Sequence, residues 1–251
     1  MSIVTAGVQN KVIHGDCLEV MPSLPDKSID MILCDLPYGT TACKWDSIIP
    51  FETLWEQYKR LIRDSGAIVL MAREPFTSVL VCSNLQGYKH KWVWNKKQSG
   101  SPQNAKYMPL QVDEDIIVFG DGLIKYYPIM RTGEYRKKGG NKRHNQIMND
   151  GWQDGFSVYN NQYHPINIID MVNPRINKLH PTQKPGELFE YLIKTYTNEG
   201  ETVLDNCAGS GTTAIACLNI NRNYILIEKE KEYIDIINKR ISEHEIQVSI
   251  C

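Results

Sequence analysis

The sequence predicts an α/β fold in which a parallel sheet carries helices on both faces. Three observations support this prediction. Short apolar runs alternate with segments of helical periodicity over residues 11–95, and the alternation resumes after residue 180. The run 67–72 is apolar throughout, which is typical of a buried parallel strand. At 251 residues, the chain can form one large domain with a substantial insertion.

The N-terminal half supplies most of the expected elements. Apolar residues at 51, 54, 55, 58, 61 and 62 form one face of a helix, and Gly66 is expected to cap its C-terminus. Trp92, Trp94 and Tyr107 are expected in the core. The strands expected in this half are 11–14, 29–35, 67–72, 88–94 and 114–119, with helices at 18–21, 51–62 and 75–84.

The middle of the chain, residues 121–179, has little periodicity and is rich in Gly and Asn. Seven Lys or Arg residues fall between Lys125 and Arg143, against a single Glu. A structureless loop of this length is unusual inside a compact domain. We therefore expect an inserted small domain or a partner-binding region. Its basic stretch suits contact with phosphates, although it also suits an ordinary solvated surface.

The C-terminal part returns to the α/β pattern. A helix is expected to begin near Pro185, and another closes the chain over 232–242. Between them lie a strand at 202–205, a glycine-rich turn at 206–213, a helix at 214–221 and a strand at 224–228.

Composition narrows the class of protein. The formal net charge is −1, so affinity for a polyanion must come from a local patch. The sequence has neither a membrane-spanning apolar stretch nor a signal-peptide pattern, so we expect a soluble cytoplasmic protein with no membrane partner. The seven Cys show no zinc-type spacing, and we interpret them as reduced thiols with no metal.

The first candidate site is Asp35-Leu36-Pro37-Tyr38, which directly follows an apolar strand. Open α/β sheets place their sites just beyond the carboxyl ends of strands. The segment offers a carboxylate, a backbone carbonyl next to a stiff proline and an aromatic ring, which together could hold a planar amine-bearing group. Asp, Pro and Tyr are also common in ordinary turns.

The second candidate site is the strand, turn, helix and strand over residues 202–228. Gly209 and Gly211 allow close approach of a ligand at a helix N-terminus, and Glu228 could accept hydrogen bonds from ribose hydroxyls. Neither GxGxxG nor a phosphate-binding GxxxxGK[ST] is present, so a nucleoside triphosphate is not expected. Because only one helix follows this unit, the fold would be circularly permuted, with the glycines beside Asp35.

Together these motifs resemble those of DNA amino-methyltransferases of the permuted, beta-type order. Asp35-Leu36-Pro37-Tyr38 is similar to the [DNS]-P-P-[YFW] motif, and residues 180–185 match the HPTQKP segment. Residues 205–213 are similar to D-x-F-x-G-S-G-T-T, and Gly15-Asp16 resembles the pair near the cofactor adenine. Leu36 replaces a proline and Cys207 replaces a phenylalanine, which loosens the backbone at the first site and removes an aromatic wall from the second.

The resemblance implies a Rossmann-like methyltransferase sheet with helices on both faces. It also implies a catalytic domain made of residues 1–120 and 180–251, and a target-recognition insertion over 121–179. The cofactor would be S-adenosylmethionine, and the partners would be double-stranded DNA, a second copy in a homodimer and a cognate restriction endonuclease. The implied catalytic residues are Asp35, Leu36, Pro37 and Tyr38. The implied cofactor-binding residues are Asp16, Cys17, Asp35, Thr182, Lys184, Asp205, Cys207, Ala208, Gly209, Ser210, Gly211, Thr212 and Glu228. The implied DNA-binding residues are Arg131, Arg136, Lys137, Lys138, Lys142 and Arg143.

In such a site, the Asp35 carboxylate and the Leu36 carbonyl would hold the two hydrogens of an exocyclic amine, while Tyr38 stacks on a flipped-out base. Asp rather than Ser at the first position of the motif goes mostly with the N6 amine of adenine, and the N4 amine of cytosine stays open. Two further alternatives are methylation of an RNA base or a protein amide, and an inactive DNA-binding subunit that keeps the fold.

Overall fold

The structure is a computed structural model that describes residues 10–39, 46–100, 102–139, 157–173 and 184–250. The chain forms two compact units. The first comprises Met1–Tyr127 and Asn167–Cys251, and the second is Pro128–Ile166. The insertion expected over 121–179 thus contains short segments that belong to the first unit.

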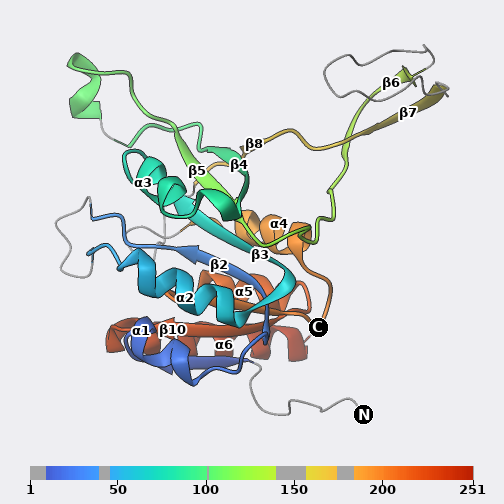
Figure 1. The fold of residues 1–251 in the computed structure, drawn as a ribbon. Helices are drawn as coiled ribbons and strands as arrows, with labels where there is room; N and C mark the ends of the chain where they lie inside the picture. The colour runs from blue at the N-terminus through green and yellow to red at the C-terminus, as the bar shows by residue number, and fades with distance from the viewer. Residues whose placement is uncertain (1–9, 40–45, 101, 140–156, 174–183, 251) are drawn as a thin grey trace. The chain divides into compact units, whose positions relative to one another are not determined.

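The first unit is built on an eight-stranded sheet with the order β1-β10-β9-β2-β3-β5-β4-β8 (Figure 1). β5 is antiparallel to both of its neighbours, so the sheet is mixed rather than wholly parallel. The described residues between β4 and β5 contain no α-helix, and antiparallel strands need no crossover helix. The strands are β1 Lys11–His14, β2 Ile29–Asp35, β3 Ile62–Ala72, β4 Tyr88–Asn95, β5 Asp113–Phe119, β8 Ile168–Asp170, β9 Thr202–Asp205 and β10 Asn223–Glu228.

Helices cover both faces of this sheet, as predicted. Alternate residues of β2 enter opposite cores, with Ile32 and Cys34 on one side and Met31 and Leu33 on the other. The first core includes α1 Cys17–Val20, α2 Phe51–Leu61 and α3 Phe76–Ser83. The second includes α4 Gly186–Tyr196, α5 Thr212–Asn219 and α6 Lys231–Ile250. Three short 3₁₀ turns, η1 Met21–Ser23, η2 Leu85–Gly87 and η3 Pro102–Lys106, complete the described helical elements.

Gly66 does not cap a helix, which corrects the sequence prediction. α2 ends at Leu61, and Gly66 lies inside β3, where the pairing with β2 shifts register. A Cβ at this position would lie 2.7 Å from the backbone oxygen of Asp30. The glycine therefore lets two strands approach closely at an irregularity in the sheet.

Asp30 connects three strands at one end of the sheet, opposite to the strand ends that carry the predicted motifs. Its carboxylate accepts a hydrogen bond from the Thr202 backbone nitrogen at 3.0 Å and pairs with Arg63 at 3.0 Å and Lys125 at 3.4 Å. The Asp30 side chain is only 2 % exposed. These contacts tie the start of β2 to β9 and β3, and they give a buried charge the partners it requires.

The second unit contains the antiparallel pair β6 Arg131–Gly139 and β7 Ser157–Tyr163. Tyr135 stacks on Tyr159 with ring centroids 5.6 Å apart, and the Arg136 guanidinium lies 5.5 Å from the centroid of the Tyr163 ring. Arg131, Arg136 and Lys137 are all exposed. Cross-strand ring and cation contacts of this kind stabilise a two-stranded ribbon.

The aromatic residues expected in the core divide into two groups. Trp92 and Trp94 are 3 % and 0 % exposed, which confirms the prediction for them, whereas Tyr107 is 84 % exposed and the prediction for it was wrong. Tyr107 directly follows η3, so it lies outside the sheet. Among the described residues, none of the helices combines the length and the apolar character needed to cross a lipid bilayer.

Candidate active site

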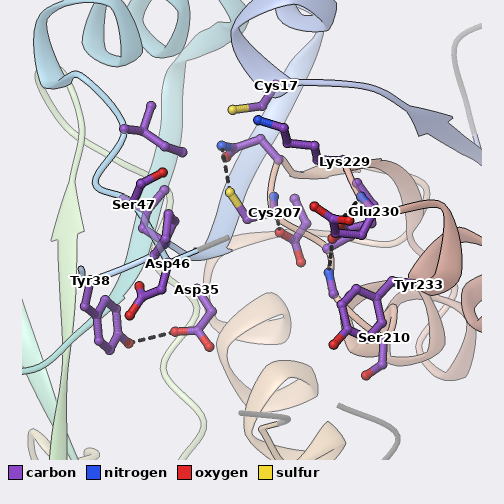
Figure 2. A pocket seen from close by; sticks show the side chains of 18 of the residues that line it. Cys17, Asp35, Tyr38, Asp46, Ser47, Cys207, Ser210, Lys229, Glu230 and Tyr233 are labelled. Atoms are coloured by element: carbon purple, nitrogen blue, oxygen red, sulfur yellow. Dashed lines mark hydrogen bonds between the residues drawn. The ribbon is translucent and has the colours of Figure 1, made fainter. Parts of the chain in front are cut away.

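A cavity of about 640 Å³ lies at the edge of the sheet where β2, β9 and β10 end (Figure 2). It is lined by Asp35 at the end of β2, by the turn that follows β9 and by Glu228 at the end of β10. β9 lies between β10 and β2, so these three strand ends are neighbours. The two candidate sites of the sequence therefore form one pocket.

Asp35 and Tyr38 are joined directly. The Tyr38 hydroxyl donates to Asp35 Oδ1 at 2.7 Å, the contact drawn as a dashed line in Figure 2. The Tyr38 ring stacks on Phe76 with centroids 5.1 Å apart. Burial, together with the charges of Asp35 and Glu114, raises the pKa of Tyr38 well above its usual value, so the hydroxyl stays protonated and donates.

Leu36 shows how the sequence accommodates the loss of a proline. Its side chain is 4 % exposed and packs in the core beneath the pocket. The backbone is thus anchored by a buried side chain rather than by a ring closure. The Leu36 carbonyl, which should accept a hydrogen bond, lies in a restrained segment. Asp35 on one side ends a paired strand, and Pro37 follows on the other.

Lys184 reaches Asp35 from the segment that precedes α4. Its ammonium lies 2.6 Å from Asp35 Oδ2 and 3.3 Å from Glu114 Oε2, and its side chain is 7 % exposed. Burial acts to lower the pKa of Lys184, but the carboxylates of Asp35 and Glu114 outweigh it and the pKa is raised. Lys184 is therefore a buried cation beside the candidate catalytic carboxylate.

The glycine-rich turn after β9 is braced by Glu228. Gly209 and Gly211 have positive φ angles of 51° and 77°, which glycine adopts without strain. The Gly209 nitrogen donates to Glu228 Oε2 at 2.7 Å, and the Glu230 nitrogen donates to Glu228 Oε1 at 2.8 Å. Burial raises the pKa of Glu228 above its usual value. A carboxylate offers about four acceptor sites, so ribose hydroxyls could use a site that the backbone leaves open.

Asp205 lies at the end of β9, and its side chain also stabilises the glycine-rich turn. Its carboxylate accepts hydrogen bonds from the Thr213 hydroxyl and, at 3.1 Å, from the Cys207 backbone nitrogen. Burial raises the pKa of Asp205 to about 7, against opposing effects of these hydrogen bonds. The residue lines the pocket, and its own contacts show that it orders the turn.

Asp16 and Cys17 line the far end of the pocket. Asp16 caps α1 by accepting from the Leu18 nitrogen at 3.0 Å, and it pairs with Lys229 at 3.2 Å. Cys17 and Cys207, both visible in Figure 2, belong to a cluster of thiols that also includes Cys34. Burial raises the pKa of Cys34 to about 12, so this thiol is neutral. No group of three or more His, Cys, Asp or Glu side chains suited to a metal occurs in the described ranges.

The structure brings most of the predicted site residues together around this cavity. The predicted residues that line it are Asp16, Cys17, Asp35, Leu36, Pro37, Tyr38, Lys184, Asp205, Cys207, Ala208, Gly209, Ser210, Thr212 and Glu228. Gly211 is the N-cap of α5, directly beneath the turn. Thr182, Lys142 and Arg143 lie outside the described residues. Arg131, Arg136 and Lys137 are exposed in the second unit, to which Lys138 also belongs.

Sequence reasoning missed Arg73, Glu114 and Asn173, which also line the pocket. A signal for two of them existed. Arg73 directly follows β3, and Glu114 lies in the acidic first half of a strand that ends in four apolar residues. Because β5 runs antiparallel, its start lies at the same edge as the ends of β2 and β3.

The fold and the pocket define a class of protein: an α/β transferase with a nucleoside-binding turn beside a carboxylate and a tyrosine suited to holding an amine. The chain belongs to the DNA methylase family, whose model matches residues 29–239. Methyltransferases of the same architecture have been solved with S-adenosylmethionine, which is the cofactor of this class.

Two bacterial proteins illustrate the similarity in sequence. The DNA adenine methyltransferase YhdJ of Escherichia coli (strain K12) is 29% identical to this chain, in an alignment that covers 92% of this chain and 82% of YhdJ. The type II methyltransferase M.HpaI of Haemophilus parainfluenzae is 26% identical, with coverage of 93% and 74%.

Solved structures show the same similarity in the fold. The M1.HpyAVI–SAM complex superposes with a TM-score of 0.63 at 25% identity, covering 92% of this chain and 98% of that one. The cytosine-N4-specific PvuII DNA methyltransferase superposes with a TM-score of 0.67 at 16% identity, with coverage of 92% and 86%. At this identity, the similarity to the PvuII methyltransferase shows a shared fold alone.

Proposed function

We propose that the protein transfers a methyl group from S-adenosylmethionine to the N6 amine of adenine in double-stranded DNA. The observation that carries this proposal is the position of Asp35 and Tyr38 beside the glycine-rich turn of β9, within one cavity. The similarity to an adenine methyltransferase over 92% of the chain supports the choice of adenine. The N4 amine of cytosine is the alternative, because a carboxylate can accept a hydrogen bond from either amine.

The residues of the pocket fit the cofactor. Glu228 has free lone pairs for ribose hydroxyls, and the positive φ of Gly209 exposes the backbone of the turn. Asp16 and Cys17 border the end where an adenine would lie, which leaves the methionine part near Asp35 and Lys184. When bound, the cofactor supplies a methyl group on a positively charged sulfur.

The chain's own residues then prepare the acceptor amine. An exocyclic amine is a weak nucleophile because its lone pair is delocalised into the ring. The Asp35 carboxylate and the Leu36 carbonyl would accept its two hydrogens and favour a tetrahedral nitrogen, so that the lone pair points at the methyl carbon. As the nitrogen–carbon bond forms, the carbon–sulfur bond breaks and its electron pair stays on sulfur. The nitrogen then releases one proton, which the Asp35 carboxylate accepts and passes to the solvent. Alignment of two bound reactants can supply up to about 7–11 kcal/mol of the barrier.

The depth of the site requires the target base to leave the helix. Asp35 is only 22 % exposed at its side chain, and an amine inside a duplex could not reach it. The Tyr38 ring, already stacked on Phe76, would receive the flipped base by stacking.

The partners follow from this function. We propose that residues 121–179 carry sequence recognition and that Arg131, Arg136, Lys137, Lys138, Lys142 and Arg143 contact phosphates. We also propose a symmetric homodimer, because so short a chain has little surface with which to surround a duplex. The similarity to type II methyltransferases supports a cognate restriction endonuclease as a functional partner, and a bacterial DNA substrate would place the protein in the cytoplasm.

Methyl transfer from labelled S-adenosylmethionine tests the proposal directly. Purified protein should label duplex DNA and not RNA, and mass spectrometry of the digested product should find N6-methyladenine. Asp35→Ala should abolish transfer while cofactor binding and folding persist, because it removes the acceptor and no core volume. Methylcytosine without methyladenine would establish the N4 alternative, and an active Asp35→Ala variant would refute the mechanism.

A further inference from the structure

Four charged side chains of alternating sign form a continuous row that ends at the candidate catalytic carboxylate. Lys96 Nζ lies 2.9 Å from Glu114 Oε1, and Glu114 Oε2 lies 3.3 Å from Lys184 Nζ. Lys184 Nζ in turn lies 2.6 Å from Asp35 Oδ2. The four residues come from separate segments of the chain, next to or within β4, β5, the start of α4 and β2. Such a row exists only in the folded protein.

Glu114 stands out within this row. Its side chain is 14 % exposed, and its Oε2 atom is buried without a hydrogen-bond partner in the described part of the chain. Lys184 is near this oxygen, but the geometry does not complete a hydrogen bond. The ion pair with Lys184 satisfies this oxygen only in part, and an incompletely satisfied carboxylate beside a pocket points to a functional role.

The proposed reaction suggests a role for Glu114 as a second carboxylate near the acceptor. Methyl transfer places a positive charge on the acceptor nitrogen, directly beside Asp35. A lone lysine 2.6 Å from Asp35 would cancel much of the negative charge that stabilises this nitrogen. Glu114, on the other side of Lys184, offsets the lysine. The three groups nearest the acceptor, Asp35, Lys184 and Glu114, then carry a charge of −1 rather than zero, and Lys96, on the far side of Glu114, brings the whole row to zero.

We propose, on the basis of the function proposed above, that Glu114 is a positioning residue: acting through Lys184, it keeps Asp35 oriented and electrostatically available to the acceptor amine. Lys184 is thereby assigned to the catalytic carboxylate rather than to the glycine-rich turn. The groups that face Lys184 are Asp35 from β2, Tyr38 from the loop after it and Glu114 from β5. Lys96 faces Glu114 from the end of β4.

Glu114→Gln tests this role because it keeps the shape and removes the charge. The single-turnover rate constant should fall by about 10- to 100-fold, the loss expected for one charged contact. The KM values for cofactor and DNA should stay within about twofold. Glu114 acts through the protonated form of Lys184, so the rate should fall at alkaline pH as Lys184 loses its proton. In Glu114→Gln the ammonium has one carboxylate partner instead of two, so this alkaline limb should move to lower pH, by about 1–3 units. Glu114→Asp should restore part of the rate and of the pH profile.

Asp115→Asn is a matched control. Asp115 is the next residue of β5, is 8 % exposed and pairs with Lys91 at 2.9 Å, but it does not line the pocket. This variant removes a carboxylate of similar burial on the other side of the strand, whose lysine partner is more exposed than Lys184. The rate and the pH profile of Asp115→Asn should match those of the wild type.

Glu114→Gln with a wild-type rate and an unmoved alkaline limb would overturn the inference. If Glu114→Gln alone does not fold, Lys96→Met with Glu114→Gln removes one positive and one negative charge together, and the same pH shift is expected. Failure of the proposed function looks different, since wild-type protein would then not methylate DNA at all. A wild type that is active, with Glu114→Gln indistinguishable from it, refutes only the positioning role.

Discussion

The hydroxyl of Tyr38 donates to Oδ1 of Asp35 at 2.7 Å, while Oδ2 of the same carboxylate faces Lys184 at 2.6 Å. Both oxygens of the carboxylate that we propose accepts one hydrogen of the target amine therefore already have a partner among the protein's own side chains. An incoming amine must displace or share one of these contacts. The tyrosine contact is the easier one to give up, because it involves a neutral group rather than a buried charge.

This arrangement separates two roles of Tyr38. Tyr38→Phe keeps the ring and removes the competing hydroxyl, so the methylation rate should stay within about threefold of the wild type, or rise. Tyr38→Ala also removes the stacking surface, worth about 1–3 kcal/mol, so transfer should slow by about one to two orders of magnitude. Steady-state methylation of a duplex with one target site measures both. Equal, severe losses in the two variants would show that the hydroxyl itself is essential.

Glu228 should govern cofactor affinity. Glu228→Ala removes the acceptor of ribose hydroxyls and leaves the nitrogens of Gly209 and Glu230 without their acceptor. A charge-assisted hydrogen bond contributes about 1.5–3 kcal/mol, so calorimetric titration should show affinity for S-adenosylmethionine lowered by about 10- to 100-fold. Glu232→Ala, an exposed residue outside the pocket, is the control. Unchanged affinity in Glu228→Ala would reject this role.

The basic side chains of the second unit should dominate the salt dependence of DNA binding. Replacing Arg131, Arg136 and Lys137 together by Gln should weaken binding and reduce the slope of log K against log salt by up to about 0.9 per lost phosphate contact. The matched control replaces three exposed lysines of the first unit, Lys11, Lys59 and Lys239. Cofactor affinity should not change in either variant. If both triple variants keep the wild-type slope, the basic residues are only a solvated face.

Asp205 should make the protein less stable as the pH rises. Its pKa is about 7 in the folded protein against a usual value of 3.8. Between these values the folded protein keeps a proton that the unfolded chain releases, so the free energy of unfolding falls as pH rises through this window. The total loss is on the order of 4 kcal/mol. Urea unfolding without cofactor at pH 4–8 measures it. Asp205→Asn should flatten the profile, and an unchanged pH dependence would contradict the assignment.

Much of the site could be predicted because its chemistry lies at the ends of strands. Asp35 and Glu228 each end an apolar run, and Gly209 and Gly211 mark a turn whose backbone must approach a ligand. Local sequence is sufficient for such features, since a strand and the residue after it form one structural unit. The two cores were also predictable, because the apolar periodicity of each element decides which face it buries.

Contacts between distant segments could not be predicted in the same way. Lys184 and Asp35 are 149 residues apart, and only the packing of α4 against the sheet brings them together. Glu114 resembles any acidic residue at the start of a strand until the antiparallel direction of β5 is known. Gly66 follows a helical pattern, as a cap would, but the approach of β3 to Asp30 explains its presence. In each case tertiary structure overrides a sound local expectation.

The contacts of Asp30 have a consequence for how the two halves of the pocket stay aligned. β2 carries the carboxylate that we propose to be catalytic, and β9 carries the turn that we propose to bind the cofactor, yet these strands pair only through Met31 with Val203 and Ile32 with Leu204. The Thr202 nitrogen bound to Asp30 extends this short ladder by one hydrogen bond at its far end. Under the proposed function, the spacing between methyl donor and acceptor would therefore depend in part on contacts at the end of the sheet away from the pocket. A substitution of Asp30 should therefore slow the reaction by shifting β2 relative to β9, although every residue of the pocket is unchanged.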